Sequence, residues 1–267
     1  MYLYKISLYI DKSDIYKDII NYIALITYYT EGEGLSISYV RKILKLDLNF
    51  SPRKVLDVIN GEKGNFIYYS NGAFKVCHSV VALEIIKHTY STDSIEFEKF
   101  LEKFVDDMCS CEKKEAISYR LNELYMKLFI KRDIEGDIAN NMQRKNFSPL
   151  ILALENSYLQ EKFFAFLVDM VPNNAHFRQH YGRLIIYNNP WKLEFSKVQF
   201  DEAIHLDPYN PLHYHARGNM YTKYIMDLCR NKYKENGVKE LFDNVMLLTN
   251  EAICDYETSV QLIIETK

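Results

Sequence analysis

The stretch Phe195–Tyr221, FSKVQFDEAIHLDPYNPLHYHARGNMY, decides the fold of this chain. Its first half places a small, an aromatic and a small residue at Ser196, Phe200 and Ala203, at the spacing of one helix face. Pro208 follows in a turn of the type that ends a helix. Apolar periodicity then resumes, so the stretch predicts two helices joined by a short proline-containing turn.

The second of these helices carries an aromatic residue, a glycine and a second aromatic residue at Tyr214, Gly218 and Tyr221. Because glycine has no Cβ, Gly218 lets the paired helix approach closely. This order of residues resembles the tetratricopeptide repeat, whose period is about 34 residues. The resemblance implies an α-solenoid in which each helix pair buries its apolar face against the next.

Two altered units flank this junction. Upstream, AHFRQHYGRLIIY places Gly182 in the role of Gly218, although YNNPWK makes this unit about two residues longer than the consensus. Downstream, an insertion of roughly twenty residues precedes NEAICDYETSVQLI, which repeats the small, aromatic, small spacing. Its members are Ala252, Tyr256 and Ser259. The alternative interpretation is an unspecialised helical bundle.

The N-terminal part predicts three helices followed by a hairpin. The first helix begins at Ser13 or Asp14 and ends near Tyr29, and ISYVRKILKL and PRKVLDVIN follow as the second and third. Two β-prone runs then surround Asn71 and Gly72, a strong hairpin signal. The order helix, helix, helix and hairpin is typical of a winged helix.

The whole chain is therefore expected to be mostly α. We expect a winged-helix-like domain at 1–90, a helical linker region at 91–147 and tetratricopeptide-like helical repeats at 148–267. The linker is assigned from amphipathic segments whose apolar residues recur three and four apart, such as SIEFEKFLEKFVDDM.

Composition narrows the function classes. Of the 267 residues, 48% are hydrophobic and 26% are charged, which argues against wholesale disorder. The net charge of −3 is spread along the chain without basic runs, so nucleic acid is an unlikely partner. The most apolar window, 19–29, is shorter than the about 20 residues that cross a bilayer, and the N-terminus lacks the features of a signal peptide. These features predict a cytoplasmic protein without a membrane contact, and the odd number of cysteines, five, predicts reduced thiols.

The exit of the predicted hairpin, FKVCHSVVALEII, resembles the end of the winged-helix domain in signal-transducing NTPases with numerous domains (STAND proteins). In that family a Met-His-Asp or Arg-His motif starts a helix of the type HxxIAxEIL, and here Val76, Cys77 and His78 occupy the motif. The order of the three parts also resembles the C-terminal region of bacterial antiviral defence members. The resemblance implies that His78 contacts an ADP phosphate when an NTPase domain lies upstream or in a partner chain.

The sequence departs from that family in two respects. It contains no GxxxxGK[ST] phosphate loop, so the chain alone is not expected to hydrolyse ATP or to hold a cofactor. Cys77 replaces the usual Met or Arg, and Ser79 replaces the usual Asp. The alternative for His78 is a histidine that caps the following helix or bonds to a backbone carbonyl, without a ligand.

No motif indicates catalysis or a metal site. A Gly-x-Ser-x-Gly elbow is missing, and adjacent residues such as Cys77 and His78 do not form a dyad by position alone. His213 and His215 are two apart and diverge on a helix, while the four-apart pair His176 and His180 lacks the glutamate of a metalloprotease helix.

The leading hypothesis is a non-catalytic interaction or sensor module that binds a protein partner through its helical repeats. Six residues are expected to line the partner-binding groove: His176, Arg178, His180, Tyr214, Arg217 and Tyr221. The alternative is a winged-helix transcription regulator that reads DNA with FSPRKVLDVI, where Arg53 and Lys54 favour contact with DNA and Asp57 opposes it.

Overall fold

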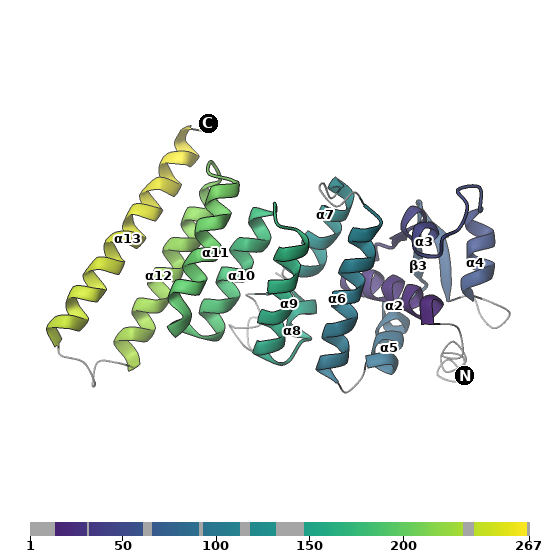
Figure 1. The fold of residues 1–267 in the computed structure, drawn as a ribbon, viewed down its shortest axis with the longest axis horizontal. Helices are drawn as coiled ribbons and strands as arrows, with labels where there is room; N and C mark the ends of the chain where they lie inside the picture. The colour runs from purple at the N-terminus through teal and green to yellow at the C-terminus, as the bar shows by residue number, and fades with distance from the viewer. Residues whose placement is uncertain are drawn as a thin grey trace. The chain divides into compact units, whose positions relative to one another are not determined.

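The computed structural model describes residues 14–30, 32–60, 66–90, 93–112, 118–131, 147–231 and 238–265 (Figure 1). Helix dominates these ranges, and their β structure is one small three-stranded sheet, which confirms the prediction of a mostly α protein. The chain forms two compact units, Met1–Asn156 and Ser157–Lys267. Residues 1–13, including the expected helix cap at Ser13, and residues 132–146 of the expected linker lie outside the described ranges.

The first unit is built on α2 (Asp14–Tyr29), which packs against α5 (Ser79–Tyr90) and β3 (Ala73–Val76). In the C-terminal half of α2 apolar residues on all sides are fully buried, among them Ile19, Ala24 and Leu25, which point in different directions. A helix that is apolar all round requires neighbours on every side. Helix α2 ends at Tyr29, shortly before Gly32, which has a φ of 92°.

The sheet joins β1 (Leu35–Ser36), β2 (Ile67–Ser70) and β3 in the antiparallel order β1-β3-β2. The two-residue turn between β2 and β3 has φ of 51° at Asn71 and 82° at Gly72, as a primed hairpin turn requires, so the predicted hairpin is confirmed.

Two short helices connect β1 to β2. Ser36 caps α3 (Ile37–Ile43) by accepting a hydrogen bond from the Ser38 backbone N–H, and α4 (Pro52–Asn60) begins with proline at its first position, as expected. Helix α4 packs on β2 through Val55 and Ile59, both fully buried.

The remaining elements of the first unit are α6 (Ser94–Ser110), α7 (Tyr119–Tyr125), the π-helical turn η2 (Met126–Ile130) and α8 (Pro149–Leu152). Tyr22 of α2 links to α6, because its hydroxyl donates to Asp107 Oδ2 at 2.7 Å and its ring lies 5.5 Å from that of Phe100. The aromatic side chains of α6 therefore continue the core of α2.

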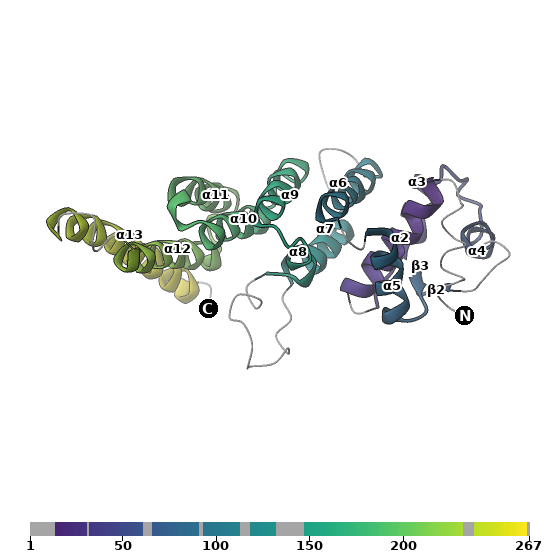
Figure 2. The same cartoon turned by 90° about the horizontal axis from the view of Figure 1, so that it is seen from below.

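The second unit contains α9 (Ser157–Met170), α10 (Ala175–Asn188), the 3₁₀ turn η3 (Pro190–Lys192), α11 (Leu193–Leu206), α12 (Pro211–Asn231) and α13 (Val238–Glu265). Each helix packs on the next along the chain (Figures 1 and 2). The predicted pair of helices around the DPYN turn is present as α11 and α12. Much of the insertion expected after Tyr221 is helical, because α12 continues to Asn231 and α13 starts at Val238.

Two glycines set the closest helix approaches in this unit. A Cβ on Gly182 of α10 would lie 2.9 Å from carbons of the Phe200 ring and 3.0 Å from the Ser196 carbonyl oxygen of α11. A Cβ on Gly218 of α12 would lie 2.8 Å from Cε1 of Tyr256 on α13. Both glycines are therefore required for close packing, as the sequence predicts.

Candidate functional site

The six residues expected in a groove lie on two helices of the second unit. His176, Arg178 and His180 belong to α10, whereas Tyr214, Arg217 and Tyr221 belong to α12. His180 and Tyr221 are only 7% and 2% exposed, so neither offers a surface to a partner. The other four are partly exposed.

Arg217 is held by carboxylates from two neighbouring helices. Its Nε and Nη2 donate to the two carboxylate oxygens of Asp255 on α13 at 2.9 and 2.6 Å, and its Nη1 donates to Asp201 on α11 at 2.5 Å. Burial disfavours the charged guanidinium, but its hydrogen bonds to Asp255 and Asp201 and the negative charges of these carboxylates outweigh burial and raise the pKa of Arg217. Each of the three guanidinium nitrogens donates one hydrogen bond to a carboxylate of the chain itself, so Arg217 joins α11, α12 and α13.

Tyr221 lies in the core beneath this ion cluster, with Ile186, Phe200 and Ala252 among its neighbours. Its hydroxyl is buried and has no hydrogen-bond partner among the described residues. Burial raises the pKa of Tyr221 to about 12. The aromatic position is therefore filled for packing, at the cost of an unsatisfied hydroxyl.

A second buried polar group lies where α10 meets α12. His213 is fully buried, its Nδ1 lies 2.6 Å from Gln179 Oε1, and its ring centroid is 5.4 Å from that of His176. Burial, followed by the charge of His176, lowers the pKa of His213, so the neutral ring donates from Nδ1 to Gln179. Across the described residues, no group of three His, Cys, Asp or Glu side chains is placed to hold a metal ion.

A partly exposed cluster outside the six predicted groove residues lies along α10, η3 and α12. Its members, which we call the aromatic-basic surface, are Arg183, Tyr187, Trp191, Lys223 and Tyr224. The Tyr187 ring has the Arg183 guanidinium at 5.5 Å and the Lys223 ammonium at 5.9 Å from its centroid, both within cation-π range. Trp191 meets Tyr224 edge-on at 5.9 Å and is 46% exposed.

The repeat spacing contains a signal for this surface. Tyr187 follows Gly182 by five residues, and Lys223 follows Gly218 by five residues, so the two occupy equivalent places on successive helices. Equivalent places on packed helices of a repeat lie on one face. A comparison of the two helices at this offset would have placed Tyr187 beside Lys223.

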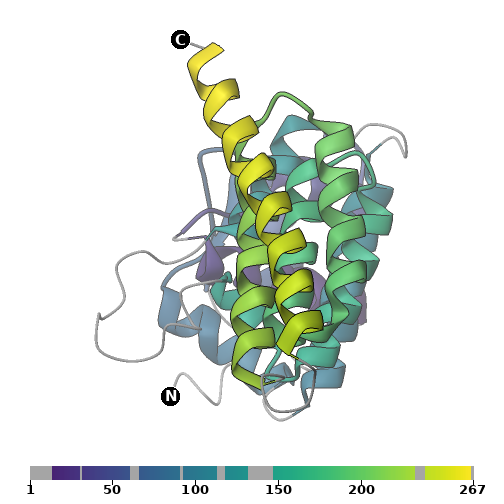
Figure 3. The same ribbon diagram turned by 90° about the vertical axis from the view of Figure 1, so that its left-hand side faces the viewer.

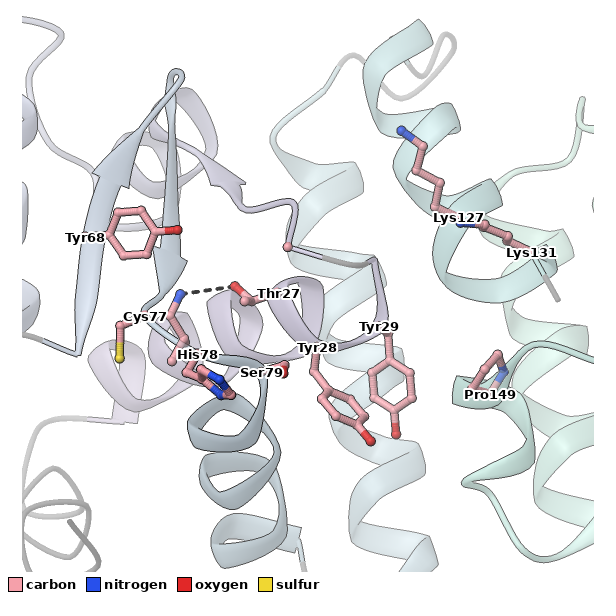
Figure 4. A pocket seen from close by; sticks show the side chains of 12 residues that line it. Thr27, Tyr28, Tyr29, Tyr68, Cys77, His78, Ser79, Lys127, Lys131 and Pro149 are labelled. Atoms are coloured by element: carbon pink, nitrogen blue, oxygen red, sulfur yellow. Dashed lines mark hydrogen bonds between the residues drawn. The ribbon is translucent and has the colours of Figure 1, made fainter. Parts of the chain in front are cut away.

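In the first unit, His78 lies at the rim of a cavity of about 600 Å³ (Figure 4). The imidazole is exposed, and its Nδ1 accepts a hydrogen bond from the Val80 backbone N–H at 3.2 Å. His78 therefore caps the N-terminus of α5, which is the ligand-free alternative for this residue. Figure 4 shows the thiol of Cys77 directed away from the His78 ring, so the two side chains do not form a nucleophile and base pair.

The opposite wall of this cavity carries tyrosines and lysines, including Tyr28 and Tyr29 at the end of α2 and Lys127 and Lys131 near η2. Lys127 is paired with Glu33 at 2.5 Å and Glu123 at 3.1 Å, and these hydrogen bonds raise its pKa. The wall is thus polar and hydroxyl-rich, with the cationic charge of Lys127 already balanced by two carboxylates.

No protein-family model, curated protein or solved structure matches this chain. Among the described helices, none combines the length and the apolar character that crossing a bilayer would require.

Proposed function

We propose that this protein is a non-catalytic interaction module whose C-terminal helices are tetratricopeptide-like repeats that bind an acidic segment of a protein partner. The aromatic-basic surface carries the proposal. Tryptophan, tyrosine and arginine dominate the energetics of protein interfaces, and here they gather with a lysine on one face where Trp191 is exposed and the other four residues are partly exposed.

The chemistry of the surface favours a partner with carboxylates next to an apolar or aromatic residue. Arg183 and Lys223 flank the Tyr187 ring, so a carboxylate beside that ring meets two cations. Lys223 pairs with Asp227 at 2.7 Å, and its side chain remains 30% exposed. Trp191 adds an exposed apolar edge.

Binding of random-sequence displayed peptides tests this proposal. We expect selection on the full chain to enrich peptides that carry Asp or Glu beside an aromatic residue. Tyr187→Ala and Lys223→Glu should each lower the affinity for the selected peptides by about tenfold or more, because each removes a central contact.

Phe195→Ala is the matched control. Phe195 is 69% exposed on α11, and it belongs neither to the aromatic-basic surface nor to the six predicted groove residues. It should leave binding unchanged. Enriched peptides without acidic residues, or equal affinity in the Tyr187→Ala variant, would contradict the proposal.

The N-terminal unit supports a relation to the C-terminal region of STAND proteins. The element order of α2, β1, α3, α4, β2 and β3, with the sheet order β1-β3-β2, is what a winged helix requires. His78 lies beside an open cavity, where it would meet a nucleotide only if an NTPase domain were supplied in cis or in trans. An in-frame phosphate-loop domain encoded upstream of Met1, or in a neighbouring gene, supports this relation, and its absence from both places contradicts it.

A DNA-binding regulator is the second candidate, favoured by one observation. Helix α4 buries Val55 and Ile59 and leaves Arg53 and Lys54 exposed at its N-terminal turn, where recognition helices contact DNA. A gel shift with random duplex at physiological salt separates the two functions. Tight binding to the duplex that Arg53→Glu abolishes would favour the DNA-binding regulator. No binding to the duplex would favour the interaction module.

A further inference from the structure

The last helix, α13, carries a stripe of exposed apolar side chains. The stripe comprises Phe242, Met246, Ile253, Val260 and Ile264, which are 61%, 46%, 46%, 56% and 67% exposed. Figure 3 shows α13 nearest the viewer, with no other helix of the second unit in front of it. Contiguous exposed apolar surface of this kind marks an interaction site in soluble proteins.

The stripe is separate from the face that α13 uses inside the fold. At 3.6 residues per turn its five members fall within a narrow sector of the helix. The residues that α13 buries point to a different side, and they are Leu241, Ala252, Asp255 and Ser259. Ser259 donates to the Pro211 carbonyl oxygen and Asp255 binds Arg217, so this other side is the one packed on α12. Packing of the unit therefore leaves the stripe uncovered.

The spacing of the stripe reads the same in both directions. Successive members are four, seven, seven and four residues apart. When two such helices lie antiparallel about a two-fold axis through Ile253, Phe242 of each copy meets Ile264 of the other. Met246 then meets Val260, and Ile253 meets itself. A two-fold interface needs a surface that is complementary to itself in this way.

The charges beside the stripe fit the antiparallel pairing. Lys239 and Glu265 lie at opposite ends of α13 on the same flank and are both exposed. Antiparallel pairing brings Lys239 of each copy close to Glu265 of the other, so two opposite-charge contacts close the ends. On the same flank, Glu257 faces Asn250 of the other copy, which avoids a like-charge contact.

We propose that a second copy of this chain covers the stripe, with α13 packed antiparallel on α13 to form a two-fold homodimer. This inference is independent of the proposed peptide site, because the aromatic-basic surface lies on α10, η3 and α12.

Sedimentation equilibrium of the full chain in the micromolar range tests the dimer. The wild-type chain should sediment as two copies. Ile253→Asp places two carboxylates on the two-fold axis and should give one copy, whereas Leu247→Asp should remain dimeric. Leu247 is a matched control, since it is 61% exposed on the same helix but outside the stripe. A monomeric wild-type chain, or a folded Ile253→Asp chain that stays dimeric, would overturn the proposal.

Disulfide trapping tests the register without burying a charge. In a background where the exposed Cys77, Cys229 and Cys254 are serine, Ile253→Cys should cross-link to itself on mild oxidation. Met246→Cys and Val260→Cys should cross-link only when the two variants are mixed. Self-linking of Met246→Cys would indicate parallel helices, and no cross-link in any of the three would exclude contact through the stripe, so either result overturns the antiparallel pairing.

Discussion

The Tyr256 ring on α13 lies directly over Gly218 on α12, where a Cβ would be 2.8 Å from Cε1 and 3.0 Å from Cζ. The Tyr256 hydroxyl donates to Asn219 Oδ1 at 3.0 Å and lies 3.1 Å from Thr222 Oγ1, so the hydroxyl end of the ring is held by two residues of α12. This contact joins α12 to the helix that follows the expected insertion.

Gly218→Ala should therefore destabilise the C-terminal unit. Alanine adds about 1 kcal/mol of helix propensity over glycine, but overpacking against a fixed ring costs about 1–3 kcal/mol. We expect a net loss of about 1 kcal/mol in the free energy of unfolding, measured in urea by the fluorescence of Trp191, the single tryptophan of the chain. In a Tyr256→Leu background the same change should be neutral or stabilising. A loss of the same size in both backgrounds would show that the ring is not the obstacle.

Gly182→Ala should cost more than Gly218→Ala. Its Cβ would meet two carbons of the buried Phe200 ring at 2.9 Å and the backbone oxygen of Ser196 at 3.0 Å. The Ser196 hydroxyl also donates to the Gly182 carbonyl oxygen at 2.7 Å, which fixes the two helices at this distance. We expect a loss of about 2–3 kcal/mol in the same urea experiment. A smaller loss than for Gly218→Ala would mean that α10 and α11 separate easily.

The sequence predicts that Gly182 and Gly218 allow close approach, but it does not identify the opposing residues. Phe200 is 18 residues from Gly182, whereas Tyr256 is 38 residues from Gly218 because the insertion intervenes. Helix types and the hairpin follow from local patterns, since capping, proline positions and Asn-Gly turns act within a few residues.

The six groove residues could not be assigned correctly from local sequence patterns, because their exposure depends on contacts between different helices. Arginine is a residue type that is common in binding sites, but Arg217 is paired within the chain. Its partners Asp201 and Asp255 come from two other helices. Its role depends on the register of α13, which follows the insertion. Tyr187 and Lys223 each follow a glycine by five residues, but only the packing of α10 on α12 shows that the ammonium lies near the ring.

The two carboxylates that bind Arg217 should differ in their contribution to stability. Asp255 has a side chain only 6% exposed and accepts two hydrogen bonds, whereas Asp201 is 43% exposed and accepts one. Asp255→Ala should lower the free energy of unfolding by about 2–3 kcal/mol, because it leaves a half-buried guanidinium without its main partner. Asp201→Ala should cost about 1 kcal/mol or less. Equal losses in the two variants would contradict this order.

Tyr221→Phe should be neutral or stabilising, in contrast to most core substitutions. The Tyr221 hydroxyl is buried without a hydrogen-bond partner among the described residues, so its removal deletes an unsatisfied group and keeps the ring. We expect a gain of up to about 1 kcal/mol in the free energy of unfolding, from urea denaturation. Tyr221→Leu is the control for packing and should destabilise. A loss in Tyr221→Phe would indicate that an ordered water binds the hydroxyl.

The stability of the C-terminal unit should decrease on mild acidification because of His213. Burial and the charge of His176 lower the pKa of His213 in the folded chain below its usual value of about 6.5. The unfolded chain then binds a proton more readily than the folded chain. The contribution of His213 is complete above pH of about 6.5 and is lost as the pH falls toward the lowered pKa, by at most about 1.4 kcal/mol per pH unit.

Comparison with His213→Gln isolates this effect, because the other six histidines are present in both proteins. The free energy of unfolding of the wild-type chain, minus that of the variant, should be constant above neutral pH and should decrease between pH of about 6.5 and 5. Asp207 Oδ2 lies 3.5 Å from His213 Nε2 and acts in the opposite direction, so Asp207→Asn should steepen the decrease. A difference independent of pH would show that His213 takes up a proton as easily in the folded chain as in the unfolded one.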